Sequence, residues 1–203
     1  MKHPIRLAAT LLAAALFTTA AAHAAPTPGQ PAPDFSLTDA TGQKRSLSEY
    51  KGKYVVLEWT NPDCPFVKKH YGSGNMAKLQ QYAKEKGVVW LAIDSSAAGK
   101  EGYLSPDAAK AAAKKEYANC TDLLLDPDGT CGKLYGAKAT PHMFVIDPKG
   151  TLVYAGAIDS IPSADVNDIA KAQNYVRVAL DESMAGQPVK TAATKAYGCS
   201  VKY

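Results

Sequence analysis

The sequence predicts an α/β domain built on a mixed β-sheet flanked by helices. Residues 54–59 and 88–93 are compact runs of β-branched, apolar and aromatic residues, which are typical of buried strands. The segment between them has apolar residues at helical spacing, and a strand–helix–strand unit places its two strands in parallel. Residues 143–146 and 152–155 flank an Asp-Pro-Lys-Gly turn, which predicts an antiparallel hairpin. Both kinds of pairing together indicate a mixed sheet.

The N-terminal half is expected to contain another hairpin and the helix of the strand–helix–strand unit. Residues 35–38 and 43–46 flank Asp-Ala-Thr-Gly, whose turn chemistry predicts the hairpin. After the first buried strand the helical spacing continues as far as Gly87, and we expect Gly72 and Gly74 to break or kink the helix. The apolar positions are Phe66, Val67, Tyr71, Met76, Leu79 and Tyr82.

The middle of the chain predicts a helix and a short strand. Residues 105–118 begin with Ser-Pro-Asp, which combines a serine cap, a proline at the first helical position and an acid in the first turn. Residues 123–125 are three leucines that predict a strand, and one or two helical turns are expected to lead to Tyr135 and Gly136.

The C-terminal region predicts one more helix and a polar tail. Ser163 is the expected cap and Gly186 the expected end of this helix. The tail is residues 187–203. The apolar face of the helix comprises Val166, Ile169, Val176, Leu180 and Met184.

The first 24 residues have the layout of a secretory signal peptide. Lys2, His3 and Arg6 form a basic head, an apolar run covers residues 7–22, and Ala-His-Ala provides a small-x-small cleavage site. The run is shorter and richer in alanine than a membrane span, although a retained anchor is the alternative. We therefore expect a chain processed near Ala25, with no membrane span in the mature form, located in a bacterial periplasm.

Composition narrows the choice of partners. The 203 residues carry a formal net charge of +4 with lysines scattered among acids, so we expect no nucleic-acid partner. The four cysteines do not have the close CxxC or HxxxH spacing of a zinc site, and no nucleotide or other cofactor motif is present. We expect one domain, residues 25–186, followed by the tail.

Cys64 is the residue most suited to chemistry. It lies where a strand ends and a helix begins, with Pro65 fitting the first helical turn. The unpaired amides and the dipole at a helix N-terminus stabilise a thiolate, and Lys68 and Lys69 would add positive charge. Such a thiolate can attack a disulfide or a peroxide. The alternative is a packed structural cysteine.

Several short motifs occur in a fixed order along the chain: PGQPAPDF at 28–35, the strand 54–59 leading to NPDCPFV at 61–67, DPDG at 126–129, Tyr135-Gly136 and Thr140-Pro141. Together with the order of elements, these motifs resemble the thioredoxin fold, in the form found in the peroxiredoxin and AhpC/TSA group. This form has an N-terminal β-hairpin extension and a central insertion. The resemblance covers roughly residues 29–186.

The resemblance implies a role for Thr140 and Pro141 in substrate binding. The proline at this position of the fold is usually cis. It would lie beside Cys64 and leave a backbone edge free to pair with an extended substrate.

Three departures from the related families bear on the reaction. Val67 stands where thioredoxins have the second cysteine of CxxC. Leu57 and Asn61 stand where peroxiredoxins have a proline and the Thr or Ser that orients peroxide. The chain therefore resembles peroxiredoxin-like redoxins that have neither full motif, and efficient peroxidase activity is not expected.

Cys199 is the candidate resolving cysteine. The ending Gly-Cys-Ser resembles that of the same redoxin subgroup. The 13 residues from Gly186 to Cys199 reach at most about 43 Å, enough to cross a domain of this size. A disulfide between Cys64 and Cys199 is thus sterically feasible, either as part of the reaction or as a staple for the tail.

Other polar residues have weaker claims. Glu58, in the strand that leads to Cys64, could relay protons or could face outward. His70 and His142 could lie near the thiol, but surface positions are expected for both. Cys131 should be buried on a short helix. Cys120 and Cys131 lie at opposite ends of a predicted strand, about 18 Å apart, too far for a disulfide unless the chain folds back sharply.

Three functions remain open at this point. The leading hypothesis is an extracytoplasmic thiol redox protein, either a thiol–disulfide oxidoreductase or a peroxiredoxin-like antioxidant, acting on protein or small-molecule thiols and disulfides or on peroxide. The second is copper handling, with soft ligands drawn from Cys64, His70, His142 and Cys199. The third is a redox-silent binding module whose cysteines are structural.

Overall fold

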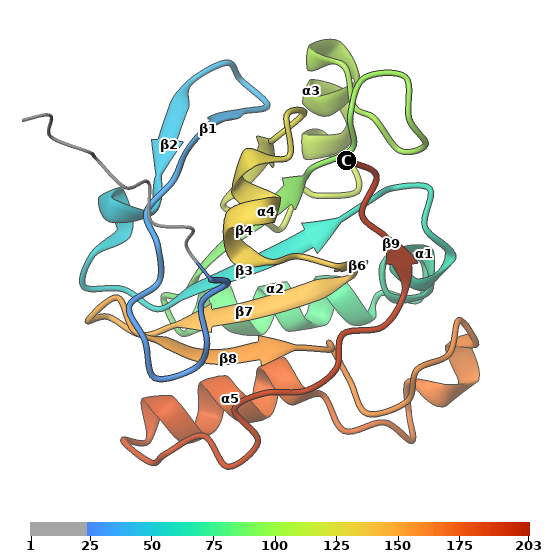
Figure 1. Cartoon of the computed structure of the whole chain (residues 1–203). Helices are drawn as coiled ribbons and strands as arrows, with labels where there is room; N and C mark the ends of the chain where they lie inside the picture. Colours follow the sequence, from blue (N-terminus) through green and yellow to red (C-terminus); the bar gives the residue numbers. More distant parts are fainter. Residues whose placement is uncertain (1–23) are drawn as a thin grey trace, which may run out of the picture.

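The computed structural model describes residues 24–203, so nearly all of the expected leader lies outside the described residues (Figure 1). Within this range the main sheet has seven strands: β1 (Ser36–Asp39), β2 (Lys44–Ser46), β3 (Val55–Thr60), β4 (Val89–Asp94), β5 (Asp122–Leu125), β7 (His142–Ile146) and β8 (Leu152–Gly156). Their order is β2-β1-β5-β4-β3-β7-β8. β3, β4 and β5 run parallel, whereas β1–β2, β1–β5, β3–β7 and β7–β8 are antiparallel pairs, so the sheet is mixed as expected.

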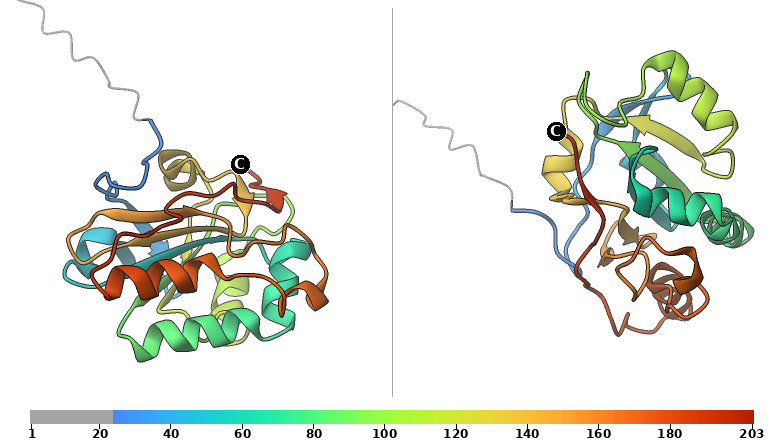
Figure 2. Two further views of the ribbon diagram at one scale, coloured as in Figure 1. Left: turned by 90° about the horizontal axis from the view of Figure 1, so that it is seen from below. Right: turned by 90° about the vertical axis from the view of Figure 1, so that its right-hand side faces the viewer.

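Helices cover both faces of this sheet. α2 and α5 lie side by side on one face, together with α3, while α4 packs on the other (Figure 2). No helix of residues 24–203 is long and apolar enough to span a bilayer. The helices are α1 (Pro65–Gly72), α2 (Asn75–Glu85), α3 (Pro106–Lys114), α4 (Thr130–Tyr135) and α5 (Tyr175–Met184), with 3₁₀ turns η1 (Leu47–Tyr50) and η2 (Val166–Asp168).

The alternation of side chains along β3 forms two core layers. Leu57 and Trp59 pack with Tyr135 of α4 on one face, and Val56 packs with Met76 of α2 on the other. All six residues of β3 are buried, as expected for a central strand covered on both faces. The end of β3, and thus the start of the segment leading to Cys64, is therefore held by the core.

The architecture confirms the expected thioredoxin fold with its two additions. β1 and β2 form the N-terminal hairpin, and α3 occupies the insertion between β4 and β5. The expected break in the long helix is also present. α1 ends at Gly72 and α2 begins after Gly74, which has φ of 75°, a conformation that glycine adopts without strain.

The prediction for the last helix is wrong at its N-terminus. α5 begins at Tyr175 and is capped by Asn174, whose side chain accepts a hydrogen bond from Arg177 N. Ser163 instead donates its hydroxyl to Asp168, in a loop that contains only the short turn η2. Val166, placed on the apolar face by its spacing, is 51% exposed. Local side-chain hydrogen bonds here compete successfully with the helix.

The tail expected at residues 187–203 is ordered against the body of the domain, and we call it the C-terminal strap (red in Figure 1). It pairs with Ala155 of β8, whose N–H donates to Ala192 O at 3.0 Å and whose carbonyl accepts from Thr194 N at 3.1 Å. Further on, β9 (Cys199–Ser200) pairs antiparallel with β6 (Ala139–Thr140) as a separate two-stranded sheet.

Candidate active site

Cys64 is the N-cap residue of α1 and is almost fully buried, with 1% of its surface exposed. Pro65 takes the first helical position, as the sequence predicts. The Cys64 thiol donates a hydrogen bond to the backbone carbonyl of Thr140 at 3.1 Å. The reactive candidate is thus in direct contact with the loop that the resemblance assigns to substrate binding.

The Thr140–Pro141 peptide bond is cis, as the resemblance implied. The expectation of a free backbone edge at this loop is wrong, however, because Thr140 pairs with Cys199 of β9. Gly198 makes the close approach feasible. It has φ of 134°, and a Cβ at this position would collide with the Thr140 carbonyl oxygen. The strap therefore occupies the edge that an extended substrate would need.

The pKa of the Cys64 thiol is lowered by its hydrogen bonds rather than by lysine charges. Burial opposes ionisation, but this effect is outweighed by the hydrogen bonds that the ionised sulfur can accept from the side chains of Cys199 and Thr140 and from the backbone of Val67 and Cys199. The counterpart is Cys199, whose pKa is raised to about 11 by burial and by its hydrogen bond with Cys64. Of the two thiols, Cys64 is therefore the more acidic and the better suited to attack.

The two lysines after Cys64 do not act as predicted. Lys68 is exposed and lies 3.4 Å from Asp63. Lys69 is buried and turns away, donating to Ser163 O at 3.0 Å and lying 3.8 Å from Asp159. Neither is among the leading influences on the pKa of Cys64.

The Thr140 side chain is a functional group that the sequence did not reveal. Its buried Oγ1 has no hydrogen-bond partner within the described residues while Cys64 is a neutral thiol donating to the Thr140 carbonyl. The same side chain favours the ionised form of Cys64. The hydroxyl thus gains a partner when the thiolate forms.

Asn61, at the position of the peroxide-orienting residue, has its amide engaged elsewhere. The side chain is buried and donates to Ser96 Oγ at 3.2 Å and Glu101 O at 2.9 Å. Its Oδ1 accepts from Asp63 N at 2.8 Å. Asn61 thereby fixes the loop before Cys64 and a neighbouring loop to each other, which leaves it poorly placed to orient a peroxide.

Glu58 is fully buried and faces α1 and α2, not solvent. Its carboxylate accepts hydrogen bonds from Trp90 Nε1 at 2.8 Å and from Tyr71 OH at 3.0 Å, with Gln80 Nε2 at 3.4 Å. Burial raises its pKa to about 7, against these hydrogen bonds, which lower it. Glu58 is not among the leading influences on the pKa of Cys64, so its role as a proton relay stays a prediction.

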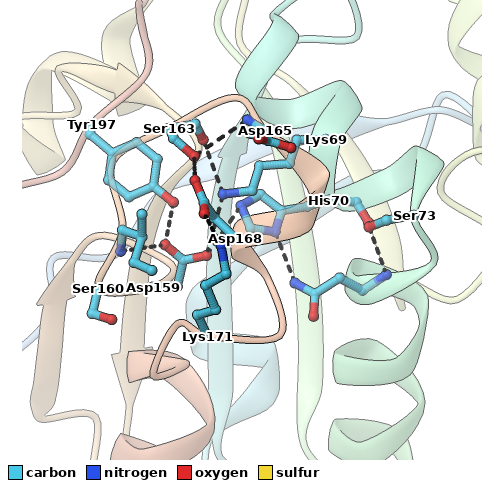
Figure 3. A network of polar contacts seen from close by, with 12 residues as sticks. Lys69, His70, Ser73, Asp159, Ser160, Ser163, Asp165, Asp168, Lys171 and Tyr197 are labelled. Carbon is cyan, nitrogen blue, oxygen red and sulfur yellow. Dashed lines mark hydrogen bonds and ion pairs between the residues drawn. The ribbon is translucent and has the colours of Figure 1, made fainter.

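The two histidines do not join the Cys64 site as metal ligands. His70 is fully buried, contrary to the expected surface position, with Nδ1 2.8 Å from Asn75 Nδ2 and Nε2 3.8 Å from Asp159 (Figure 3). His142 is half-buried, and its ring stacks on Phe144 with centroids 4.5 Å apart. Burial lowers the pKa of both to about 4. Within residues 24–203 no group of three or more His, Cys, Asp or Glu side chains could hold a metal ion.

The remaining cysteines are poorly suited to attack. Cys131 is buried on α4 as predicted, and burial raises its pKa well above the usual range. Cys120 accepts a hydrogen bond from Gln80 at 3.2 Å, and burial again raises its pKa. Of the four cysteines, only Cys64 has a lowered pKa.

Comparisons with known proteins agree with this architecture. ResA of Bacillus thuringiensis subsp. konkukian, a thiol-disulfide oxidoreductase, is 31% identical over 125 residues, which are 62% of this chain and 66% of the relative. A hypothetical protein from Sinorhizobium meliloti 1021 superposes with a TM-score of 0.73 at 27% identity, covering 89% of this chain and 96% of that one. The thioredoxin domain of an oxidoreductase from Bacteroides vulgatus shares the fold, with a TM-score of 0.51 at 22% identity over 71% of this chain and 96% of that one.

The family assignment rests on the part of the chain that contains the site. Residues 28–155 match the AhpC/TSA family, a stretch that includes Cys64 and the cis-proline loop. The match with ResA spans slightly less than two thirds of that relative's length, so it does not by itself transfer the activity of the whole protein. The chain belongs to the AhpC/TSA family of the thioredoxin-fold superfamily.

Proposed function

We propose that this protein is an extracytoplasmic thiol–disulfide oxidoreductase in which Cys64 is the attacking thiolate and Cys199 the resolving thiol. The observation that carries the proposal is the pairing of β9 with β6, which places Cys199 opposite Thr140, the residue whose carbonyl oxygen accepts a hydrogen bond from the Cys64 thiol of lowered pKa. The thiol-disulfide oxidoreductases among the relatives support the same class of reaction.

The reaction takes two exchange steps. The Cys64 thiolate attacks one sulfur of a substrate disulfide, forming a mixed disulfide and releasing the other substrate sulfur as a thiolate. Cys199, deprotonated, then attacks the Cys64 sulfur, forming the Cys64–Cys199 disulfide and releasing the second substrate thiol. The substrate gains two electrons and the cysteine pair loses two, and an external dithiol would return the pair to its reduced form.

We expect disulfides to be better substrates than peroxides. Peroxide would need a group that orients it beside Cys64, and the Asn61 amide is already bonded to Ser96, Glu101 and Asp63. An extended protein substrate would bind at Thr140 and Pro141 only after β9 leaves that edge. Any peroxidase activity should therefore be weak.

The location outside the cytoplasm is supported by the leader-like sequence of residues 1–24. An oxidising compartment would also suit a protein that cycles through a disulfide. Detection of the processed protein in a periplasmic fraction, with an N-terminus near Ala25, would test this part of the proposal.

The test of the chemistry is a peptide map after oxidation. The reduced protein receives one equivalent of a small disulfide, and we expect a Cys64–Cys199 disulfide. Cys199→Ser should stop at a mixed disulfide on Cys64. Cys64→Ser should form neither the mixed disulfide nor the intramolecular disulfide. Cys120→Ser is the matched control and should behave as the wild type.

The opposite results would identify the alternatives. If Cys64 stays free while the other thiols are unchanged, the redox-silent binding module becomes the better hypothesis. If the Cys64→Ser variant exchanges as fast as the wild type, Cys64 is not the attacking residue and the proposal fails.

A further inference from the structure

The C-terminal strap is anchored on both sides of Cys199, and each anchor includes a tyrosine. Tyr197 lies two residues before Cys199 and Tyr203 lies four residues after it. A strand of only two residues would ordinarily fray, because few contacts oppose its release. The anchors are therefore what can hold β9 in register with β6.

The upstream anchor ties the strap to the helix that begins at Cys64. The Tyr197 hydroxyl donates to Asp159, and its ring contacts Phe66 edge-on with centroids 5.8 Å apart. Asp159 in turn lies 3.8 Å from both Lys69 Nζ and His70 Nε2 of α1 (Figure 3). Since Lys69, His70 and Asp159 are all buried, this anchor is also part of the folded core.

The downstream anchor is a cradle on α4 that receives the last residue of the chain. The Tyr203 ring lies against Gly129 and Gly132, where a Cβ on either glycine would collide with it. Its hydroxyl donates to Ala137 O at 2.8 Å, and Lys133 Nζ lies 5.3 Å from the ring centroid. The preceding residue adds a hydrogen bond from Ala97 N to Lys202 O at 2.8 Å.

This second anchor is separable from the fold. Tyr203 is 37% exposed, so removing its ring opens no closed cavity in the core. Gly132 is helical without a positive φ, so the backbone tolerates alanine there, and the three atoms nearest to the added Cβ belong to Tyr203. A substitution at either Tyr203 or Gly132 can thus remove the ring from the cradle.

We propose that Tyr203 is a positioning residue that holds Cys199 against Cys64 by seating its ring in the cradle formed by Gly129 and Gly132. The inference rests on the proposed function, since it concerns the resolving step. Without the anchor, Cys199 lies on a segment held only from its upstream side, and the advantage of an oriented intramolecular reaction is reduced.

The experiment measures the effective concentration of Cys199 at Cys64. The purified protein is equilibrated in glutathione buffers of varied ratio, and the Cys64–Cys199 disulfide is quantified by mass after acid quenching. Tyr203→Ala should lower the effective concentration about tenfold, as loss of one hydrogen bond and the ring contact predicts. Tyr203→Phe, which keeps the ring, should recover most of it, and Lys195→Ala, an exposed strap residue, should match the wild type.

Gly132→Ala provides the reciprocal change. It should lower the effective concentration to the same degree as Tyr203→Ala, and the double variant should show no additional loss, because both changes empty one cradle. The Cys64 pKa should rise in both variants, since Cys199 donates to the thiolate less often. Thermal unfolding of Tyr203→Ala should stay close to that of the wild type.

The outcomes separate this inference from the proposed function. A wild-type protein that forms no Cys64–Cys199 disulfide in any buffer would refute the resolving role itself. A wild type that forms it, alongside a Tyr203→Ala variant of unchanged effective concentration, would overturn only the positioning role. Additive losses in the double variant would likewise overturn it, because the two residues would then act separately.

Discussion

Glu58→Gln should change how the stability of this protein depends on pH. The carboxyl is fully buried and its pKa is raised from 4.5 to about 7. Between these values the unfolded chain has lost the proton and the folded chain still holds it, so the folded state is destabilised as pH rises. The difference between the two pKa values corresponds to a loss of about 3 kcal/mol in the free energy of unfolding. Glutamine does not ionise, so the variant escapes this loss.

The measurement must be a comparison of two proteins, because other groups titrate in the same range. The pKa values of His70 and His142 are lowered to about 4, so their contribution makes stability rise between about 4 and 6.5, opposite to Glu58. The contributions of the two histidines are the same in the wild type and in the variant. The difference in unfolding free energy should therefore isolate Glu58.

Urea unfolding at several pH values from 4 to 8 provides the data. Circular dichroism is the preferred probe, since Trp90 is hydrogen-bonded to Glu58 and its fluorescence could respond to the substitution directly. Between pH 4.5 and 7 we expect the unfolding free energy of the variant to rise by about 3 kcal/mol relative to that of the wild type. A difference that stays constant across this range would refute the reasoning, because Glu58 would then be ionised at low pH even when buried.

Two further substitutions test the neighbourhood of the site. Thr140→Val should raise the Cys64 pKa, which would shift the pH profile of alkylation to higher pH. The fold should lose no stability, because the removed hydroxyl has no partner beside the neutral thiol. An unchanged profile would rule out a role of the Thr140 hydroxyl in stabilising the thiolate. Asp159→Asn should destabilise the fold by about 3 kcal/mol in urea unfolding, since it leaves the buried Lys69 charge without its carboxylate. The exposed Asp63→Asn should cost less than about 0.5 kcal/mol, and equal losses in the two variants would contradict this account.

The elements with strong periodicity or turn chemistry were predictable from the sequence. The strand before Cys64, both hairpins and the helix starting at Ser105 follow from local patterns that tertiary contacts reinforce. The last helix failed because Val166 satisfies the spacing, while Asn174 provides the cap that the chain uses. Spacing alone cannot distinguish a helical face from a loop whose polar side chains bond locally.

The site was predictable only in part, because local sequence patterns do not reveal which distant segments come into contact. Cys64 and the proline loop are local motifs, and the structure places them in contact. The partner of that loop, Cys199, lies 59 residues beyond Thr140. The resemblance and the reach of the tail named Cys199 as a candidate, but a polar segment with no periodicity does not show that it will form a strand against Thr140. Apart from the Val67 backbone, the groups that lower the Cys64 pKa are consequently far away in the sequence, and the lysines next to Cys64 were wrongly expected to have this effect.

The strap also has a consequence for how the protein behaves in concentrated solution. β8 is an edge strand of the main sheet, and the strap pairs with it at Ala155 before covering the edge of β6. Unpaired strand edges are templates for association between chains. A chain cut before residue 187 would present both edges at once, so loss of the C-terminus should promote self-association as well as remove Cys199.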